Sequence, residues 1–406
     1  MPTLRRTPTF WFLAVTLGAL LFASSAPSPL YVVYQDRFDF STVTLTAVFA
    51  VYALALLLTL LVLGSISDHI GRRPTVLIAL AIEIAAMVAF AAADAVWVLI
   101  IARVLQGVGT AIAMGAISAA LLDLGPESRP TLGALTGVVA PMSGLALGAL
   151  ATGLLVDYGP APTRLVFWLL LATFALAFLA ALAMPETVRP DGLWRHSLRP
   201  RIGIPPHMRA AFVAALPCLA ATWALGGLVL SLGPSLTREV LGEESHLAGG
   251  LPIFLLAGIS AVASVRVRDI NARLTAQAGL GALITGVALA LVALATGSAA
   301  VFLVGAAVCG LGFGPAFGGI FRVLTTMAPE NRRAEVVSSV LTVSYVAFSL
   351  PAVVAGFGVV QIGLRSTATI YGATLIAMAV LALGLSGRLE EGDALENDEL
   401  AEAVAG

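Results

Sequence analysis

The chain has 406 residues, of which 59% are hydrophobic and only 11% are charged, and its mean hydropathy is +0.99. Soluble domains carry roughly 25% charged residues, so this composition excludes an ordinary soluble fold and indicates an integral membrane protein. The net charge of −1 gives no indication of a nucleic-acid partner. The two cysteines, Cys218 and Cys309, lie in apolar runs, which predicts free thiols and neither a disulfide nor a metal site.

Long apolar runs follow one another along the chain, with short polar segments between them. A helix that spans a bilayer needs about 20 apolar residues, so the chain has room for about a dozen spans. The runs are too long and too uniform for barrel strands, which leaves helices. The first run lacks a small-residue cleavage site and is interpreted as a retained helix. The twelve predicted spans cover residues 10–34, 42–65, 74–93, 95–122, 130–156, 164–184, 209–234, 246–265, 274–296, 298–326, 334–361 and 366–386.

The most distinctive segment lies between the second and third predicted spans. Residues 64–74 read G-S-I-S-D-H-I-G-R-R-P. The spacing G-x-x-x-D-x-x-G-R-R resembles the loop between the second and third membrane helices of major facilitator superfamily transporters. His69 departs from the family pattern, because a basic residue usually stands there.

The resemblance implies a conformational latch in this loop. In the family the arginine pairs with an acid at the end of the fourth helix, while the aspartate meets the start of the eleventh helix in the outward-open state. Carried over, Arg72 pairs with Asp123 and Asp68 docks near Ala334. The alternative is that the arginines only anchor the loop at the membrane surface. The latch residues are Gly64, Asp68, Gly71, Arg72, Arg73 and Asp123.

An acid and a base lie inside the third and fourth predicted spans. Glu83 and Arg103 match in depth within roughly 3 Å at 1.5 Å per residue, so we expect them to pair. An arginine this deep is costly and usually faces a cavity or a partner. Glu83 is the one carboxylate near the predicted midplane, where proton carriers usually lie, although the third helix is peripheral in the resembled family. The pair serves either proton coupling or structure alone.

Two further motifs resemble the same superfamily. The fourth span carries R-x-x-Q-G-x-G, whose arginine the family links to proton transfer; its residues here are Arg103, Gln106, Gly107 and Gly109. The fifth span resembles the motif G-x-x-x-G-P-x-x-G-G of the antiporter branches, with Ala140 and Leu145 replacing two glycines. Its matching residues are Gly137, Pro141, Gly144 and Gly148. This second resemblance implies export by exchange, and the alternative is generic packing of small residues.

The polar segment 185–208 divides the chain and is predicted to be a cytoplasmic linker between two six-helix bundles, residues 10–184 and 209–386. D-x-x-G-R at 68–72 is echoed by D-x-x-A-R at 269–273, and P-E-S-R at 126–129 by P-E-N-R at 329–332. Two echoes at nearly equal spacing predict internal duplication, with halves related about the membrane normal. Residues 1–9 form the N-terminal segment, and residues 387–406 form an acidic, disordered cytoplasmic tail.

Arginine distribution predicts the orientation. Sixteen loop arginines lie on the side of the termini and four on the other side, which places both termini in the cytoplasm. Arg322, near the inner end of the tenth span, is interpreted as a side chain that snorkels to the interface.

The middles of the first, seventh and eleventh predicted spans carry no ionisable residue, so a cavity between them suits a lipophilic or weakly polar substrate. The candidate cavity residues are Tyr52, Gln106, Met114, Met142, Trp223, Phe313, Phe317 and Tyr345.

These observations predict an all-α membrane protein of the major facilitator type: twelve helices in two pseudo-symmetric bundles, working as a monomer in the inner (plasma) membrane. The expected activity is proton-coupled efflux of lipophilic, drug-like small molecules by alternating access. No catalytic site and no cofactor are expected. One alternative is a sugar or metabolite carrier that uses polar cavity residues such as Gln106, Ser24, Ser25 and Thr222. The other is a sensor that binds ligand without turnover and signals through the acidic tail.

Overall fold

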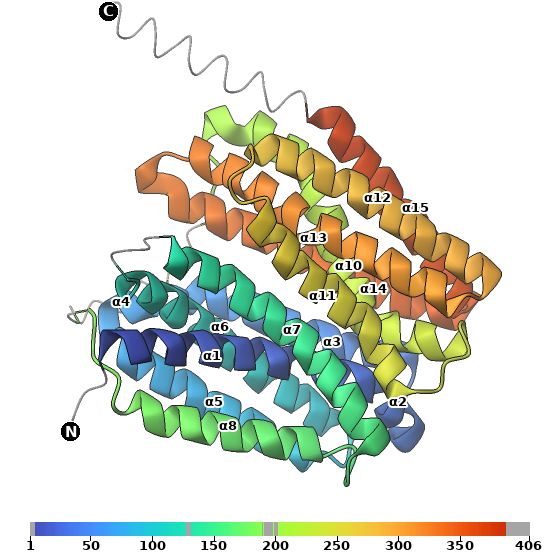
Figure 1. The fold of residues 1–406 in the computed structure, drawn as a ribbon, viewed down its shortest axis with the longest axis horizontal. Helices are drawn as coiled ribbons and strands as arrows, with labels where there is room; N and C mark the ends of the chain where they lie inside the picture. The colour runs from blue at the N-terminus through green and yellow to red at the C-terminus, as the bar shows by residue number, and fades with distance from the viewer. Residues whose placement is uncertain (1–4, 127–130, 189, 191–197, 199–201, 387–406) are drawn as a thin grey trace, which may run out of the picture.

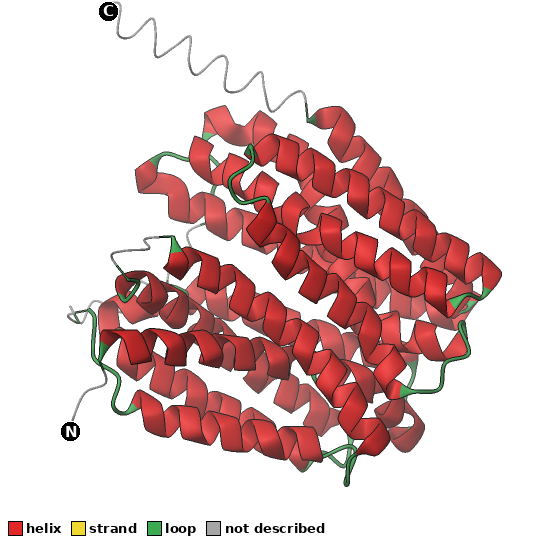
Figure 2. Ribbon diagram, viewed as in Figure 1, coloured by secondary structure: helices red, strands yellow, loops and turns green. Residues whose placement is uncertain are grey.

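The computed structural model describes residues 5–126, 131–188, 190, 198 and 202–386, and these residues form helices joined by loops (Figures 1 and 2). The first half comprises α1 (Arg6–Ser25), α2 (Pro27–Phe38), α3 (Thr42–Leu63), α4 (Ile66–Ile70), α5 (Arg72–Ala91), α6 (Val96–Asp123), α7 (Leu132–Tyr158) and α8 (Leu165–Ala181). The second half comprises η1 (Pro206–Met208), α10 (Arg209–Glu239), α11 (His246–Arg266), α12 (Ala272–Thr296), α13 (Ala299–Met327), η2 (Glu330–Arg332), α14 (Arg333–Ile362) and α15 (Leu364–Leu385). The acidic tail, residues 387–406, lies outside the described residues.

The predicted membrane fold is confirmed. Within the described residues, 11 helices are long and apolar enough to cross a membrane, with α1 and α2 counted as one, and α8 is a shorter apolar helix of 17 residues in the sixth position. The first predicted span is two helices rather than one. Pro27 has no backbone N–H to continue α1, and it begins α2 as its first residue. The seventh span runs to Glu239 rather than 234, because Pro234 is accommodated inside α10.

Corresponding helices pack in the same way in the two halves. In the first half α5 packs on α6 and α8, and in the second half α12 packs on α13 and α15. Between the halves, α7 packs against α11 and α3 packs against α14. This repeated arrangement is the one that internal duplication predicts.

The two ends of the molecule differ. We call them the α2 end and the α4 end; the described termini, Arg5 and Ser386, lie at the α4 end, and the ribbons of the two halves converge toward α2 and diverge toward α4 (Figure 1). Hydrogen bonds that join described residues of the two halves lie at the α2 end. There Arg238 donates to Asp36 at 2.8 Å, and Asp157 of α7 accepts the backbone N–H of His246 at 3.0 Å.

Candidate functional site

The loop between α3 and α5 is organised around one buried guanidinium. Arg72 is the first residue of α5, and its side chain donates to Ser67 Oγ at 2.6 Å and to the carboxylate of Asp68. Its Nε lies 3.4 Å from Oδ2 of Asp123, the last residue of α6. The structure therefore brings Arg72 and Asp123 together as the motif predicts, and it also places Asp68 on Arg72, all within the first half.

A second carboxylate, Glu186, completes this network, and sequence reasoning missed it. Its two oxygens accept the backbone N–H groups of Arg72 at 2.8 Å and Arg73 at 3.1 Å. These are the first N–H groups of α5, which have no partner inside the helix and favour negative charge. Thr187 adds a bond to Asp123 Oδ2 at 3.0 Å. The available signal was an acid directly after the sixth span, at the same end as the motif loop.

Gly71 is required at this junction for two reasons. Its φ of +99° is a backbone conformation that residues with a side chain rarely adopt. A Cβ atom at this position would also lie 2.5 Å from Glu186 Oε2. Gly64 ends α3 where α6 approaches closely, since a Cβ on Gly115 would lie 2.8 Å from the Gly64 carbonyl oxygen. The glycines of the motif thus allow the loop to close around the Arg72 network.

The docking of Asp68 on α14 is absent in this conformation. The Asp68 side chain is 53% exposed, and its hydrogen bond goes to Arg72. Helix α4, which carries Asp68, packs on α5 and α6. No hydrogen bond or ion pair joins Asp68 to the described start of α14 near Ala334. Helix α14 belongs to the second half, and the two halves diverge at this end.

The second-half copy of the loop is held by different contacts. Arg322 of α13 donates to the carbonyl oxygens of Arg268 at 2.7 Å and Ile270 at 3.3 Å, and it also reaches Thr275 Oγ1 at 3.3 Å. The Arg322 side chain thus reaches the α11–α12 loop, whose carbonyl oxygens accept from its guanidinium, and its snorkelling to the interface stays a prediction. Asp269 pairs with its neighbour Arg268 at 3.2 Å.

Arg103 is buried in the middle of the first half, with 1% of its surface exposed. It donates to the Tyr31 hydroxyl at 2.9 Å from Nε, to the Ser24 carbonyl at 3.0 Å and to Gln106 Oε1 at 2.7 Å. Its guanidinium also lies 5.1 Å from the ring centre of Tyr52. Gln106 in turn donates to the Ala23 carbonyl at 2.8 Å. The fourth-helix motif therefore binds α6 to the residues around the junction between α1 and α2.

The predicted pairing of Glu83 with Arg103 is wrong. Glu83 accepts a hydrogen bond from Thr110 at 2.7 Å, and Thr110 lies seven residues from Arg103 along α6, or about 10 Å at 1.5 Å per residue. The depth match was obtained by counting residues from the ends of the two spans. This count does not include the offset of α5 relative to α6 along their axes.

The glycines of the fourth-helix motif make room for these contacts. A Cβ on Gly109 would lie 3.0 Å from Glu83 Oε1, and a Cβ on Gly107 would lie 2.6 Å from the Tyr52 carbonyl oxygen of α3. Glu83 is fully buried, and its Oε2 has no hydrogen-bond partner among the described residues. Glu83 is thus a buried carboxyl group held by one hydrogen bond, from Thr110.

The antiporter-like motif lies on α7, with Pro141 inside the helix. Gly144 and Gly148 face α1 so closely that a Cβ at either position would collide with the carbonyl oxygens of Gly18 or Phe22. Gly137 has open space beside it. Two of the three glycines therefore pack α7 within its own half.

An aromatic cluster lies where the second half meets the first. Trp223 of α10 is 5.3 Å from Phe317 of α13 and 4.9 Å from Tyr345 of α14, measured between ring centres. Phe348 of α14 is 5.8 Å from Trp223 and 5.0 Å from Phe49 of α3, across the boundary between the halves. We call these five residues the aromatic cluster. Buried Trp223 Nε1 has no hydrogen-bond partner among the described residues.

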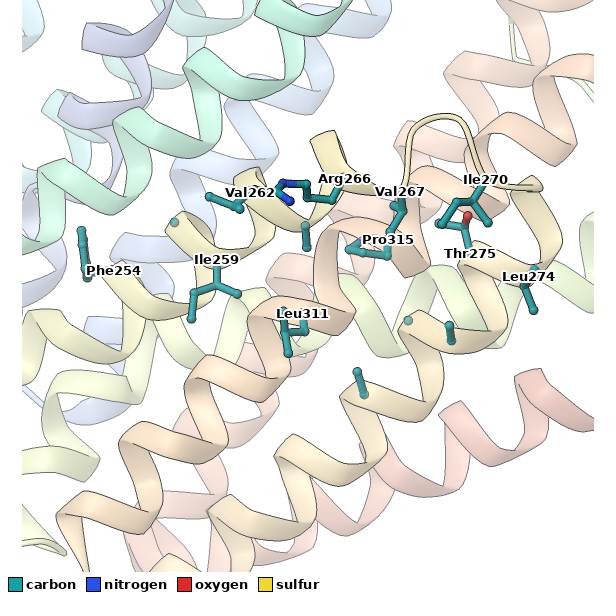
Figure 3. A pocket seen from close by; sticks show the side chains of 15 residues that line it. Phe254, Ile259, Val262, Arg266, Val267, Ile270, Leu274, Thr275, Leu311 and Pro315 are labelled. Carbon is teal, nitrogen blue, oxygen red and sulfur yellow. The ribbon is translucent and has the colours of Figure 1, made fainter.

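The other candidate cavity residues lie nearby or apart. Phe313 of α13 packs close to Gly226 of α10, where a Cβ would lie 3.1 Å from its ring. Met114 is partly buried and packs against the hydrophobic core of the first half, and Met142 is half-buried on α7. A cavity of about 900 Å³ lies elsewhere, between α11, α12 and α13, and contains none of these side chains (Figure 3). Within the described part of the chain, no group of three or more His, Cys, Asp or Glu is placed to hold a metal ion.

Residues 13–350 match the family described as the Major Facilitator Superfamily. The chain is 32% identical over 159 residues to the uncharacterized MFS-type transporter YhjO of Bacillus subtilis, a match covering 38% of this chain and 36% of that protein. It is 30% identical over 192 residues to the multidrug transporter AQR1 of Candida glabrata, covering 44% of this chain and 31% of that protein. The matches thus span about a third of the length of each relative.

Solved transporters share the fold across nearly the whole chain. A POT family transporter has a TM-score of 0.73 at 14% identity and covers 94% of this chain and 96% of its own. A bacterial homologue of the human lysosomal transporter Spinster has a TM-score of 0.72 at 14% identity, covering 95% and 98%. The nucleoside transporter NupG has a TM-score of 0.68 at 13% identity, covering 95% and 99%. At these identities the likeness establishes the fold alone.

Proposed function

This chain belongs to the Major Facilitator Superfamily, and from that premise we propose that it exports small lipophilic compounds in exchange for protons by alternating access. The family identifies a multi-pass membrane transporter rather than an enzyme. We infer that it works as a monomer in the inner (plasma) membrane, with the bundles 10–184 and 209–386 moving against each other. Because sixteen loop arginines lie on the side of the termini, we infer that the α4 end faces the cytoplasm.

The aromatic cluster carries the proposal for the substrate class. Rings from α10, α13 and α14 pack together, and Phe348 of α14 packs on Phe49 of α3 at the boundary between the halves, where alternating access exposes a substrate site. The unpaired N–H of Trp223 supplies one donor, and the neighbouring Tyr345 carries a hydroxyl. Such a site suits a flat lipophilic molecule with an acceptor atom. The multidrug transporter among the relatives supports the same class.

The polar residues that a sugar or metabolite carrier needs are occupied within their own halves. Ser25 donates to the Leu145 carbonyl at 2.8 Å, and Thr222 donates to the Cys218 carbonyl at 2.7 Å. Gln106 is held by Arg103 and the Ala23 carbonyl. These bonds favour the lipophilic substrate over the metabolite. The sensor alternative depends on the acidic tail, residues 387–406, which lies outside the described residues.

Glu83 is the proposed proton carrier. A carboxylate that is fully buried, with one oxygen unpaired, is strongly disfavoured as an anion, so we infer that Glu83 is protonated in this conformation. Proton release then requires rearrangement of α5 against α6, which couples the proton to the movement of the first half. Arg103 holds Tyr31 and Gln106 and makes no ion pair with Glu83.

The motif loop is the proposed latch for the opposite conformation. Here the halves are joined by hydrogen bonds at the α2 end, while Asp68 is half-exposed at the α4 end. We infer that closing the α4 end brings Asp68 to the first N–H groups of α14, with Arg72 and Asp123 holding α4 in place. The Asp68→Asn variant is then expected to be expressed normally but to have a strongly reduced transport flux. A normal flux in this variant would contradict the proposed latch.

Everted vesicles with an imposed acid-inside pH gradient and a pH-reporting dye test the proposed function. Lipophilic cations, neutral antimicrobials and sugars are added in turn, with vesicles that lack the protein as the control. We expect proton release on addition of lipophilic compounds and none with sugars. Release with sugars alone, or no release across the panel, contradicts proton-coupled efflux of lipophilic substrates.

A further inference from the structure

A groove separates α11 from α12 and extends to the loop that joins them, where Val267 and Ile270 lie (Figure 3). Both helices pack on α13, and successive small residues of α13 set the geometry. A Cβ on Gly310 would lie 2.8 Å from the Leu255 carbonyl oxygen of α11, and one on Gly312 would lie 2.5 Å from the Gly279 carbonyl oxygen of α12. Leu311, between these contacts, points out between the two helices and is 51% exposed.

The groove is apolar along most of its length. Its volume is about 900 Å³, and Val262 of α11 and Leu274 of α12 form part of its walls at 60% and 58% exposure. Arg266 and Thr275 are its polar lining residues. Thr275 Oγ1 already donates to the Asn271 carbonyl at 2.8 Å. The guanidinium of Arg266 is therefore the polar group that the groove offers to a ligand.

Positive charge gathers at the mouth of the groove. Arg266 ends α11, is exposed, and has no hydrogen bond or ion pair with any described residue. Arg268 and Arg322 lie in or against the loop that follows. The acid in that loop, Asp269, is already paired with Arg268. The mouth thus presents an excess of positive charge beside an apolar wall.

We propose that this groove binds an anionic phospholipid from the leaflet at the α4 end, with an acyl chain beside Val262, Leu274 and Leu311 and the phosphate on Arg266. A groove on the bilayer-facing surface is in contact with acyl chains, and a basic pocket between membrane helices selects an anionic head group. A guanidinium binds phosphate through charge-assisted hydrogen bonds. A neutral lipophilic solute fills the apolar wall but leaves Arg266 without a partner. The site is independent of the transport proposal.

Native mass spectrometry of the full-length purified protein, titrated with phosphatidylglycerol or phosphatidylcholine of the same acyl chains, tests the site. We expect wild-type protein to prefer phosphatidylglycerol, and Arg266→Gln to lose about fivefold of that preference. Arg209→Gln is the matched control, because Arg209 is also exposed at the α4 end and lies outside the groove. Equal loss in both variants, or no loss in Arg266→Gln, overturns the proposal.

A second pair of variants tests the acyl-chain part. Ala278 is an exposed lining residue of α12, so Ala278→Trp fills part of the groove without disturbing the core. Val292→Trp on the same helix, at an exposed site outside the groove, is the control. We expect reduced binding of phosphatidylglycerol in Ala278→Trp alone. Equal binding of phosphatidylglycerol to the two variants overturns the placement of the acyl chain. The placement is also overturned if a neutral lipophilic dye displaces the lipid and binds wild type and Arg266→Gln equally well.

Discussion

The two halves share their helix packing but differ in what they bury. The buried acidic and basic side chains Arg72, Glu83 and Arg103 all belong to the first half, together with the buried amide of Gln106. Across the described residues of the second half, the buried polar groups on side chains are serine and threonine hydroxyls, the Tyr345 phenol and the thiols of Cys218 and Cys309. The second half contributes four members of the aromatic cluster. Repeated packing therefore does not require repeated chemistry, and the transport proposal assigns the proton to the first half and most of the substrate contacts to the second.

The corresponding loops show the same difference on a smaller scale. In the first half, side-chain carboxylates of Asp68, Asp123 and Glu186 surround Arg72 and the start of α5. In the second half, Arg322 is held by backbone carbonyl oxygens. Carboxylates on separate segments are able to exchange partners when the halves move, whereas carbonyls of one loop hold that loop in place.

The largest effect is expected for Arg103→Leu. The change leaves Gln106 Oε1 and the Ser24 carbonyl oxygen without their donor, and each buried unsatisfied group costs about 1–3 kcal/mol. We expect loss of transport and a clearly lower unfolding temperature in detergent. Thr222→Val in the second half is the control, because it removes one hydroxyl bond within its own helix. Equal stability of the two variants contradicts the asymmetry between the halves.

A smaller effect is expected at the α2 end for Asp157→Asn. The carboxylate accepts hydrogen bonds from Ser245 Oγ at 2.6 Å and from the N–H groups of His246 and Leu247 at 3.0 and 2.9 Å, so it holds the first turn of α11. The variant is expected to open this end. A cysteine introduced at buried Thr152 of α7 is then labelled several-fold faster by a membrane-impermeant maleimide.

Asp36→Asn is the control for that experiment. Asp36 pairs with Arg238 at an exposed position, where an ion pair contributes little. We therefore expect little change in labelling. If labelling increases more for Asp36→Asn than for Asp157→Asn, the Asp36–Arg238 pair, and not Asp157, is the main contact between the halves at this end.

The helices and part of the candidate site followed from the sequence, because apolar length and motif spacing are local properties. Arg72 and Asp123 were paired by the motif, and the structure places them 3.4 Å apart. The Glu83–Arg103 pair failed because depth counted along each helix contains no information on the stagger between helices. Glu186 was missed because its partners are backbone N–H groups on a helix far away in the chain.

A modest effect is expected for Glu186→Ala, which removes the acceptor for the first N–H groups of α5. Loss of such a cap costs about 1 kcal/mol, so the unfolding temperature should fall by a few degrees. Glu330→Ala, at an exposed acid between α13 and α14 of the second half, should leave the unfolding temperature unchanged. Equal shifts for the two variants would mean that Glu186 acts as an ordinary surface charge.

The smallest effect is expected for Arg322→Gln. The shorter amide is able to keep one bond to the loop carbonyls, so we expect transport near the wild-type rate. Arg72→Gln breaks contacts to two carboxylates and should slow transport by about tenfold or more, because bonds between charged partners are worth roughly twice those between neutral ones. Initial uptake rates in everted vesicles compare the two variants. Equal rates would mean that the loops of the two halves are equivalent.

The assignment of the proton to the first half and of the substrate contacts to the second is tested most directly by comparing Glu83→Gln with Trp223→Ala in everted vesicles. Proton release on addition of a lipophilic cation reports coupled transport. Counterflow of the labelled cation without a pH gradient reports binding and movement of the substrate alone. Glutamine retains the acceptor for Thr110, so Glu83→Gln is expected to keep counterflow and lose proton release. Trp223→Ala is expected to weaken both. Proton release at the wild-type level in Glu83→Gln would contradict the account.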